Sequence, residues 1–412
     1  MELLLIALVS LLILGVPVSF SLIISSTIYL VQHDISIFVA IQRMTMSIGD
    51  SFTLISVPFF ILAGVIMNTG GITEKIFDFA DKLVGHITGG LGHANILASI
   101  IFSGMSGTAI ADAGGLGAIE LKAMRDAGYD EDFSLAITGA SSIIGPIIPP
   151  SVPAVLYAVL AGASVGRLFI AGIVPGIIMG LIMSLFVFLK CKNACYPVSE
   201  KATLRERWES FKESFLALLT PVIIIGGLLS GIFTPTEAAV VAVAYSLALG
   251  IYYKNVTLSK IKEFLRATAA HTVSVMLIVA GASIFGWILT IEQVPQLITN
   301  FFLNNVESGI LAILLINLLL LVVGTFLETI AAITILTPIL VPLALSFGFD
   351  LTHFGIIMIL NLMIGLLTPP LGMVLYVLSS VSEVPFERIV KATTPYVFVL
   401  ALTLLIFTSN NS

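Results

Sequence analysis

Two segments about 220 residues apart repeat the same helix-breaking residues in an otherwise apolar chain. Gly145 and the pair Pro149–Pro150 recur as Gly365 and Pro369–Pro370. Proline removes an amide donor and glycine permits unwinding, so peptide oxygens in these segments lose their partners within the helix. Carbonyl oxygens beside serine or threonine hydroxyls form a hard oxygen cage that suits a small cation such as Na⁺, and half-helices that begin there present positive dipole ends to an anion.

The repeat extends beyond these two segments. Gly104, Gly128, Asp130 and Pro175 recur at the same spacing as Gly324, Gly348, Asp350 and Pro395. A single Gly-Pro motif more often merely kinks a membrane helix, but two copies in register disfavour that interpretation. Paired polar, broken segments are typical of secondary transporters built from internal repeats, whose binding site lies where the copies meet. The pattern therefore predicts a carrier that moves a solute.

Composition excludes a soluble globule, because 58% of the residues are hydrophobic, only 10% are charged and the mean hydropathy is +1.13. No Gly-x-x-x-x-Gly-Lys-Ser/Thr or His-Glu-x-x-His motif occurs, so we expect neither ATP hydrolysis nor another enzyme activity, and no surface suits nucleic acid. The histidines lack ligand spacing, and Cys191 and Cys195 sit among lysines, so we expect no metal centre or disulfide. The first apolar run lacks a preceding basic stretch and is expected to be a retained span.

The apolar stretches predict a helical membrane protein with two re-entrant hairpins. Two less regular segments, about 90–124 and 308–347, are interrupted by small or polar residues at 103–108 and 324–329. Free backbone groups cost several kcal/mol each in lipid, so such breaks must be buried or line a cavity. Each hairpin precedes a broken span, at about 133–160 and 353–380. Simple spans are expected at about 2–14, 17–32, 51–68, 168–189, 213–231, 236–253, 268–290 and 389–408.

Basic residues predict the topology. With the N-terminus outside and each hairpin returning to its own side, every Lys and Arg except Arg43 and Arg167 falls on the cytoplasmic side. The expected fold is all-α and polytopic: an inverted repeat, 1–190 and 213–412, with about five spans and one re-entrant hairpin in each copy. Residues 191–212 are expected to form a cytoplasmic amphipathic connector, and 72–86 a helix in the membrane interface.

Asp112 and Glu328 lie just beyond the two hairpin breaks, and Glu237 follows a Thr-Pro-Thr break at the start of a span. An ionised carboxylate in hydrocarbon is unfavourable by at least about 2.5–3.5 kcal/mol, so such residues usually face a cavity or a partner. They are candidates for sensing protons or stabilising a cation. The alternative is that each caps the helix it begins. We favour capping for Glu237 and leave both roles open for Asp112 and Glu328.

At these motifs the chain resembles the large membrane subunit of tripartite ATP-independent periplasmic (TRAP) transporters. The strings at 102–109, 145–153 and 365–372 are similar to that family's signatures, and the resemblance covers essentially the whole chain. It implies a multi-pass protein of the bacterial inner membrane, a small four-helix membrane subunit and a periplasmic binding protein that delivers an organic acid. It also implies Na⁺-coupled uptake by an elevator motion. No segment resembles the small subunit, which is therefore expected to be a separate polypeptide.

The resemblance also implies site residues. The first Na⁺ site would use Ser103, Ser106, Gly145, Ile148 and Pro149, and the second Gly324, Thr325, Gly365 and Thr368; candidate substrate-binding residues are Thr108, Ser141, Ser151 and Thr329. Residues 105–113 and 127–132 resemble the sialic-acid branch of the family, while C4-dicarboxylates stay open as substrates. Two other functions also stay open. One is a self-sufficient carrier, such as a dicarboxylate or citrate symporter or an ion antiporter, and the other is a channel or scaffold subunit without a transport cycle.

Overall fold

The computed structural model describes residues 1–69, 71–192 and 196–409, without the side chains of residues 69, 104–106 and 258. Over these ranges the chain is helical and contains no strand. Seven helices are long and apolar enough to cross a membrane, or eight if the bent pair Phe38–Gly49 and Phe52–Asn68 counts as one span. The prediction of an all-helical, polytopic membrane protein is confirmed.

The first half of the chain contains both the first hairpin and the first broken helix. Its helices are α1 (Glu2–Ile13), α2 (Val18–Gln32), α3 (Phe38–Gly49), the short 3-10 helix η1 (Phe52–Ile55), α4 (Ser56–Thr69), α5 (Ile72–Val84), α6 (Gly90–Ser106), α7 (Ala109–Gly114), α8 (Leu116–Asp126), α9 (Glu131–Ser142), α10 (Val152–Ala161) and α11 (Val165–Cys191). Helices α6 to α8 form the first hairpin, and α9 and α10 are the two parts of the first broken helix.

The second half repeats this order. Its helices are α12 (Leu204–Leu229), α13 (Pro235–Tyr252), α14 (Leu258–Ile291), α15 (Val294–Asn305), α16 (Gly309–Phe326), α17 (Thr329–Ser346), α18 (Leu351–Gly365), α19 (Met373–Ser382) and α20 (Phe386–Ser409). Helices α16 and α17 form the second hairpin, and α18 and α19 the second broken helix. Helices α6 to α8 and α16 to α17 cover residues 90–126 and 309–346, and the two broken helices run over residues 131–161 and 351–382.

Residues that recur in the sequence occupy equivalent places in the two halves. Gly128 and Gly348 both adopt left-handed backbone angles, with φ of 81° and 80°, in the turns before the broken helices. Asp130 and Asp350 then cap α9 and α18, because their carboxylates accept hydrogen bonds from backbone amides of the first turn. The spacing of about 220 residues therefore reflects a repeat of structure.

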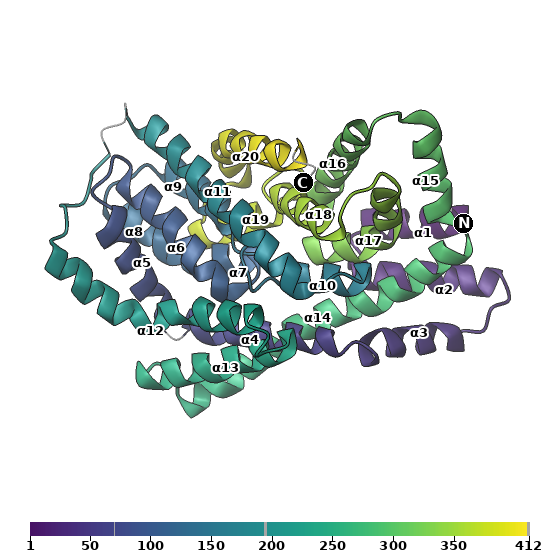
Figure 1. The fold of residues 1–412 in the computed structure, drawn as a ribbon, viewed down its shortest axis with the longest axis horizontal. Coiled ribbons are helices and arrows are strands. Elements are labelled where there is room, and N and C mark those ends of the chain that lie inside the picture. Colours follow the sequence, from purple (N-terminus) through teal and green to yellow (C-terminus); the bar gives the residue numbers. More distant parts are fainter. Residues whose placement is uncertain (70, 193–195, 410–412) are drawn as a thin grey trace.

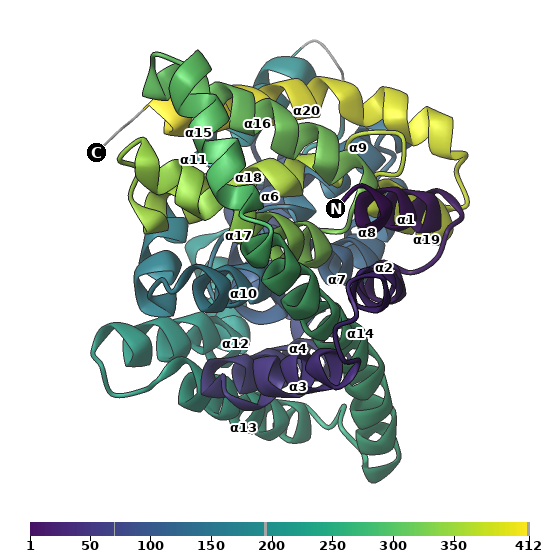
Figure 2. The ribbon, with the colours of Figure 1, turned by 90° about the vertical axis from the view of Figure 1, so that its right-hand side faces the viewer.

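The helices form two groups. Helices α3, α4, α13 and α14 lie along one side of the molecule, and α9, α11, α18 and α20 lie toward the other (Figure 1; Figure 2). Helix α4 packs on α13 and α14, while α2 packs on α14. One large hydrophobic core surrounds the hairpins and the broken helices, and a smaller one joins α1 and α2 to α14.

Three regions differ from the sequence-based expectation. Helix α3 forms where only an outside loop is expected, and it meets the following helical segment at 69°. Helices α1 and α2 have 12 and 15 residues, too short to span about 30 Å of hydrocarbon at 1.5 Å per residue if upright. The connector 191–212 is not a separate amphipathic helix. Residues 196–203 are non-helical, and the capping box of Thr203 and Glu206 starts α12, which continues to Leu229.

Candidate cation and substrate site

The first break is a buried turn of nine residues, 143–151, between α9 and α10. It contains a cis peptide bond between Pro149 and Pro150. Ser151 ends the turn: its hydroxyl accepts a hydrogen bond from the amide of Ala154 at 3.2 Å and donates one to the Pro146 carbonyl. Among the described residues, none donates a hydrogen bond to the carbonyls of Gly145, Ile148 or Pro149. These three carbonyl groups are therefore candidates for binding a ligand.

The second break, 366–372 between α18 and α19, has the equivalent cis bond between Pro369 and Pro370. The backbones of Gly365 and Gly324 meet here so closely that a Cβ added at Gly365 would lie 2.6 Å from the Gly324 Cα. The Thr325 carbonyl accepts a hydrogen bond from the amide of Leu371 at 3.2 Å. Residues 369–371 are exposed, whereas the first break is buried. The two breaks thus match in backbone but differ in accessibility.

Each hairpin reaches the break of its own half. In the first half, Gly107 lies against Pro150, whose carbonyl oxygen would be 3.2 Å from a Cβ at Gly107. In the second half, Gly324 at the end of α16 lies against Gly365, so this hairpin also contacts the end of its broken helix. The structure therefore brings Gly107 to Pro150 in the first half, and Gly324 to Gly365 and Thr325 to Leu371 in the second.

Three of the candidate hydroxyls each donate a hydrogen bond to a carbonyl three or four residues earlier in the chain. Ser103 donates its hydrogen bond to the Ile100 carbonyl at 2.5 Å, Thr325 to Val322 at 2.8 Å and Thr368 to Ile364 at 3.0 Å. A hydroxyl that donates to its own helix still has oxygen lone pairs to offer. The donor set, peptide and hydroxyl oxygens without a thiolate or imidazole, fits a hard cation. The side chain of Ser106 lies outside the described residues.

The candidate substrate hydroxyls lie in different surroundings. Thr108 caps α7 by accepting from the amide of Ala111 at 3.3 Å. Ser141 is fully buried and donates to the Oδ1 atom of Asn95 at 2.6 Å. Thr329 is also buried, in the first turn of α17, and its hydroxyl has no hydrogen-bond partner among the described residues. Ser151 lies in the first break. Ser151 thus lies in the first break and Thr108 next to Gly107, which contacts that break, whereas Ser141 bonds α9 to α6.

The acidic residues separate into two kinds. Glu328 caps α17, accepting from the amides of Ile330 and Ala331 at 3.0 and 3.4 Å, and Glu237 forms a capping box with Thr234. Both thus have the helix-capping geometry that the sequence allows. Asp112 is instead buried against the first break, where its Oδ2 atom would lie 2.1 Å from a Cβ placed at Gly145. Asp112 is therefore the intramembrane acid that contacts a candidate Na⁺ residue.

Three buried asparagines beside the sites were not predicted. Asn95 donates to the Thr138 hydroxyl at 2.8 Å, and Asn361 donates to the Oδ1 atom of Asn317 at 2.9 Å. The available signal was an amide within an apolar helix, which is unfavourable in hydrocarbon unless it finds a partner. Asn95 and Asn317 also recur at nearly the spacing of the other paired residues.

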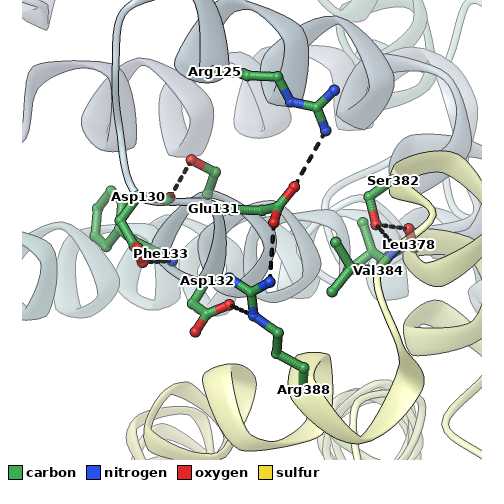
Figure 3. A network of polar contacts seen from close by, with 10 residues as sticks. Arg125, Asp130, Glu131, Asp132, Phe133, Leu378, Ser382, Val384 and Arg388 are labelled. Atoms are coloured by element: carbon green, nitrogen blue, oxygen red, sulfur yellow. Dashed lines mark hydrogen bonds and ion pairs between the residues drawn. The ribbon is translucent and has the colours of Figure 1, made fainter.

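A charged cluster joins the two halves at the start of the first broken helix (Figure 3). Arg388 at the start of α20 forms ion pairs with Glu131 at 3.2 Å and with Asp132 at 2.5 Å, and Arg125 from α8 approaches Glu131 at 3.4 Å. The side chains are about half exposed. This cluster links the first hairpin and α9 to the last helix of the chain.

Comparison with known proteins identifies the family of the chain. The family model for the DctM component of tripartite ATP-independent periplasmic transporters matches residues 5–412. The chain is 50% identical over 392 residues to the sialic acid TRAP transporter large permease protein SiaM of Vibrio cholerae, covering 95% of this chain and 92% of that protein. It is 43% identical to the sialic acid TRAP transporter permease protein SiaT of Haemophilus influenzae, covering 96% of this chain and 64% of that protein.

A solved structure shares the fold. The crystal structure of the YdaH transporter from Alcanivorax borkumensis superposes with a TM-score of 0.60 at 14% identity, covering 88% of this chain and 86% of that one. Members of the matched family are transporters of the inner membrane rather than enzymes, and the seven apolar spans agree with that location. The chain belongs to the DctM family, the large membrane permeases of tripartite ATP-independent periplasmic transporters.

Proposed function

We propose that this permease carries out Na⁺-coupled uptake of an organic acid, with sialic acid as the favoured substrate. The observation that carries the proposal is the pair of helix breaks, each met by its own hairpin and each rich in oxygen atoms suited to a hard cation. The relatives named as sialic acid permeases, at 50% and 43% identity, support the choice of substrate. A separate small four-helix membrane subunit and a periplasmic binding protein would complete the system, and the word tripartite in the family's description supports two further components.

We propose an elevator motion in which the hairpins and the broken helices slide as one unit. The contacts between the halves are reciprocal: α7 packs on α19 and α10 on α17, while α9 packs on α20 and α11 on α18. These contacts connect the hairpins, the broken helices, α11 and α20 into one body. Helices α1 to α4 and α12 to α14 would then be the stationary part. The N-terminus would be periplasmic, and the inverted repeats would span 1–190 and 213–412.

Coupling to two ions supplies the free energy that an anionic substrate needs. One Na⁺ entering down about 100 mV releases about 2.3 kcal/mol, and a tenfold gradient adds about 1.4 kcal/mol. Two ions therefore release about 7 kcal/mol, and a substrate with one negative charge opposes this by about 2.3 kcal/mol. The remainder still permits accumulation by more than about a thousandfold. Two cation sites are useful for this reason.

Uptake into proteoliposomes tests the proposal. The permease, with its small subunit and a candidate binding protein, is supplied with labelled sialic acid while Na⁺ and the membrane potential are varied separately. We expect uptake that requires Na⁺ outside, that requires the binding protein and that increases with an inside-negative potential. A C4-dicarboxylate serves as the competing substrate.

The alternatives predict other results. Uptake by the permease alone would identify a self-sufficient carrier, and preference for the dicarboxylate would reassign the substrate. Uptake that is indifferent to Na⁺ and follows the substrate gradient would contradict ion coupling. No solute movement under any condition, with the three components assembled, would indicate a scaffold subunit.

A further inference from the structure

We propose that two buried polar clamps fix each hairpin against its broken helix and thereby set the geometry of the two cation sites. The first clamp is Asn95, Thr138 and Ser141, and the second is Asn317, Asn361 and Thr408. Their role would be to position the walls of the sites rather than to bind the ion. This inference rests on the proposed Na⁺ coupling.

The first clamp joins α6 of the hairpin to α9 of the broken helix. The Nδ2 atom of Asn95 donates to the Thr138 hydroxyl at 2.8 Å, and the Ser141 hydroxyl donates to the Oδ1 atom of Asn95 at 2.6 Å. None of the three residues is more than 1% exposed. Both polar ends of the asparagine side chain therefore bond to the same facing helix.

The second clamp joins α16 of the hairpin to α18 of the broken helix and also to α20. The Nδ2 atom of Asn361 in α18 donates to the Oδ1 atom of Asn317 in α16 at 2.9 Å and to its carbonyl at 3.0 Å. The Nδ2 atom of Asn317 donates to the Thr408 hydroxyl in α20 at 2.8 Å. All three residues are buried. Asn317 thus ties the second hairpin to two helices at once.

The clamps lie next to the sites along the broken helices. Ser141 precedes Gly145 by four residues, and Asn361 precedes Gly365 by four. Ser141 lies in the last turn of α9, two residues before the first break, and Asn361 lies about one turn before Gly365, the last residue of α18. The contact that fixes the helix is therefore adjacent to the residues that would bind the ion.

The clamps are also placed alike on the hairpins. Asn95 precedes Ser103 by eight residues, and Asn317 precedes Thr325 by eight. Eight residues are slightly more than two turns, so the asparagine and the site residue fall near the same face of the hairpin helix. Each clamp therefore joins the hairpin to neighbouring helices about 12 Å along the hairpin helix from the candidate site residue.

Hydrogen bonds are needed here because apolar contacts alone define the register poorly. Leucine and isoleucine side chains can repack when two membrane helices slide past each other, whereas an asparagine that leaves its partner is unsatisfied in an apolar interior. A cation site depends on oxygen positions to within tenths of an ångström. Loss of an outer support typically lowers metal affinity about 10- to 100-fold.

Thermal unfolding of the purified permease in lipid nanodiscs tests this inference without any transport assay. NaCl is titrated at constant ionic strength with choline chloride, because an ion that binds the folded state raises the melting temperature in a saturable way. Thr138→Val and Thr408→Val keep the side-chain shape and remove the hydroxyl acceptor. We expect each to raise the half-saturating Na⁺ concentration about tenfold.

Matched controls separate the clamp from general packing. Thr138→Ser keeps the hydroxyl and should retain the wild-type Na⁺ dependence. Thr403→Val makes the same replacement at a buried threonine of α20. The Thr403 hydroxyl donates to the Val399 carbonyl within its own helix, so this variant should also leave the Na⁺ dependence unchanged. If Thr138→Val does not fold, Ser141→Ala serves in its place, since it removes the other bond to Asn95.

The outcomes are distinguishable. Valine variants that melt at lower temperature in Na⁺ and in choline alike, with unchanged half-saturation, would show that the clamps are only structural and would overturn the inference. A wild-type protein that Na⁺ does not stabilise would overturn the proposed Na⁺ coupling itself. A shift in half-saturation in Thr138→Val and Thr408→Val, absent in Thr403→Val and Thr138→Ser, supports the positioning role.

Discussion

Gly365 illustrates how one residue type is required at the candidate site. A Cβ at this position would lie 2.5 to 2.8 Å from three backbone atoms of Gly324, and backbone atoms cannot move aside as a flexible side chain can. The two glycines therefore let the second hairpin approach the broken helix more closely than any other residues would allow. This approach brings Thr325 toward the second break.

Replacing Gly365 by alanine should separate these two backbones. We expect Gly365→Ala to lower the stability of the folded protein by about 1–3 kcal/mol, as overpacking of a core does, and to abolish Na⁺-driven uptake. Thermal unfolding in nanodiscs measures the first effect, and proteoliposome flux the second. Gly226→Ala in α12 is the control, since nothing lies within 4 Å of a Cβ there and alanine favours the helix. Equal melting temperatures for the two variants would contradict the close approach.

Sequence reasoning located these residues but not their contacts. Gly145, Gly365 and the proline pairs stand out because they break an apolar helix twice at one spacing. The contact of Gly324 with Gly365, by contrast, depends on how the hairpin packs on the helix, which no local pattern specifies. Asn95 and Asn317 had a visible signal, an amide within an apolar helix, but their partners are 43 and 44 residues away in the chain.

At the scale of elements, proline and glycine are the local signals from which the breaks between helices could be predicted. Helices α9 and α18 end at the segments where glycine and proline interrupt the apolar sequence, because such residues are strong local signals. Helix α3 was missed because its sequence is only moderately apolar and contains Arg43. The connector was also mistaken for a separate helix. The capping box at Thr203 begins α12, and no breaker follows before the span, so the helix is continuous.

The charged cluster around Arg388 makes a prediction at this scale. Arg388→Gln removes both ion pairs that link α20 to the start of α9. Because these side chains are about half exposed, we expect a loss of stability of only about 1 kcal/mol or less. The loss should shrink in 1 M KCl, where the screening length is about 3 Å. Unfolding temperatures at low and high KCl provide the measurement.

A matched variant shows whether the link between the halves matters. Arg205→Gln removes an ion pair between Arg205 and Glu209 within a single helix, where both side chains are more exposed. It should change the stability by less than about 0.5 kcal/mol. If Arg388→Gln behaves in the same way at low salt, the cluster does not help to hold the two halves together.

At the scale of the whole molecule, the two halves exchange contacts. The hairpin of each half packs against the second part of the other half's broken helix, α7 on α19 and α17 on α10. Neither half therefore completes the central body alone. The repeat was visible in the sequence, but this exchange was not, because it depends on how the two copies meet in space. The exchange is what would let two cation sites move together in one elevator step.

The central claim is that the paired, oxygen-rich breaks couple ions to substrate movement. The most direct test is the Na⁺ dependence of uptake by Thr368 variants. In proteoliposomes containing the complete transport system, Thr368→Val should raise the Na⁺ concentration for half-maximal sialic acid uptake about tenfold or more, since it removes a candidate hydroxyl ligand but keeps the side-chain shape. Thr368→Ser should stay close to the wild type. If Thr368→Val, assembled normally, takes up substrate with the wild-type Na⁺ dependence, the second break does not bind the coupling ion.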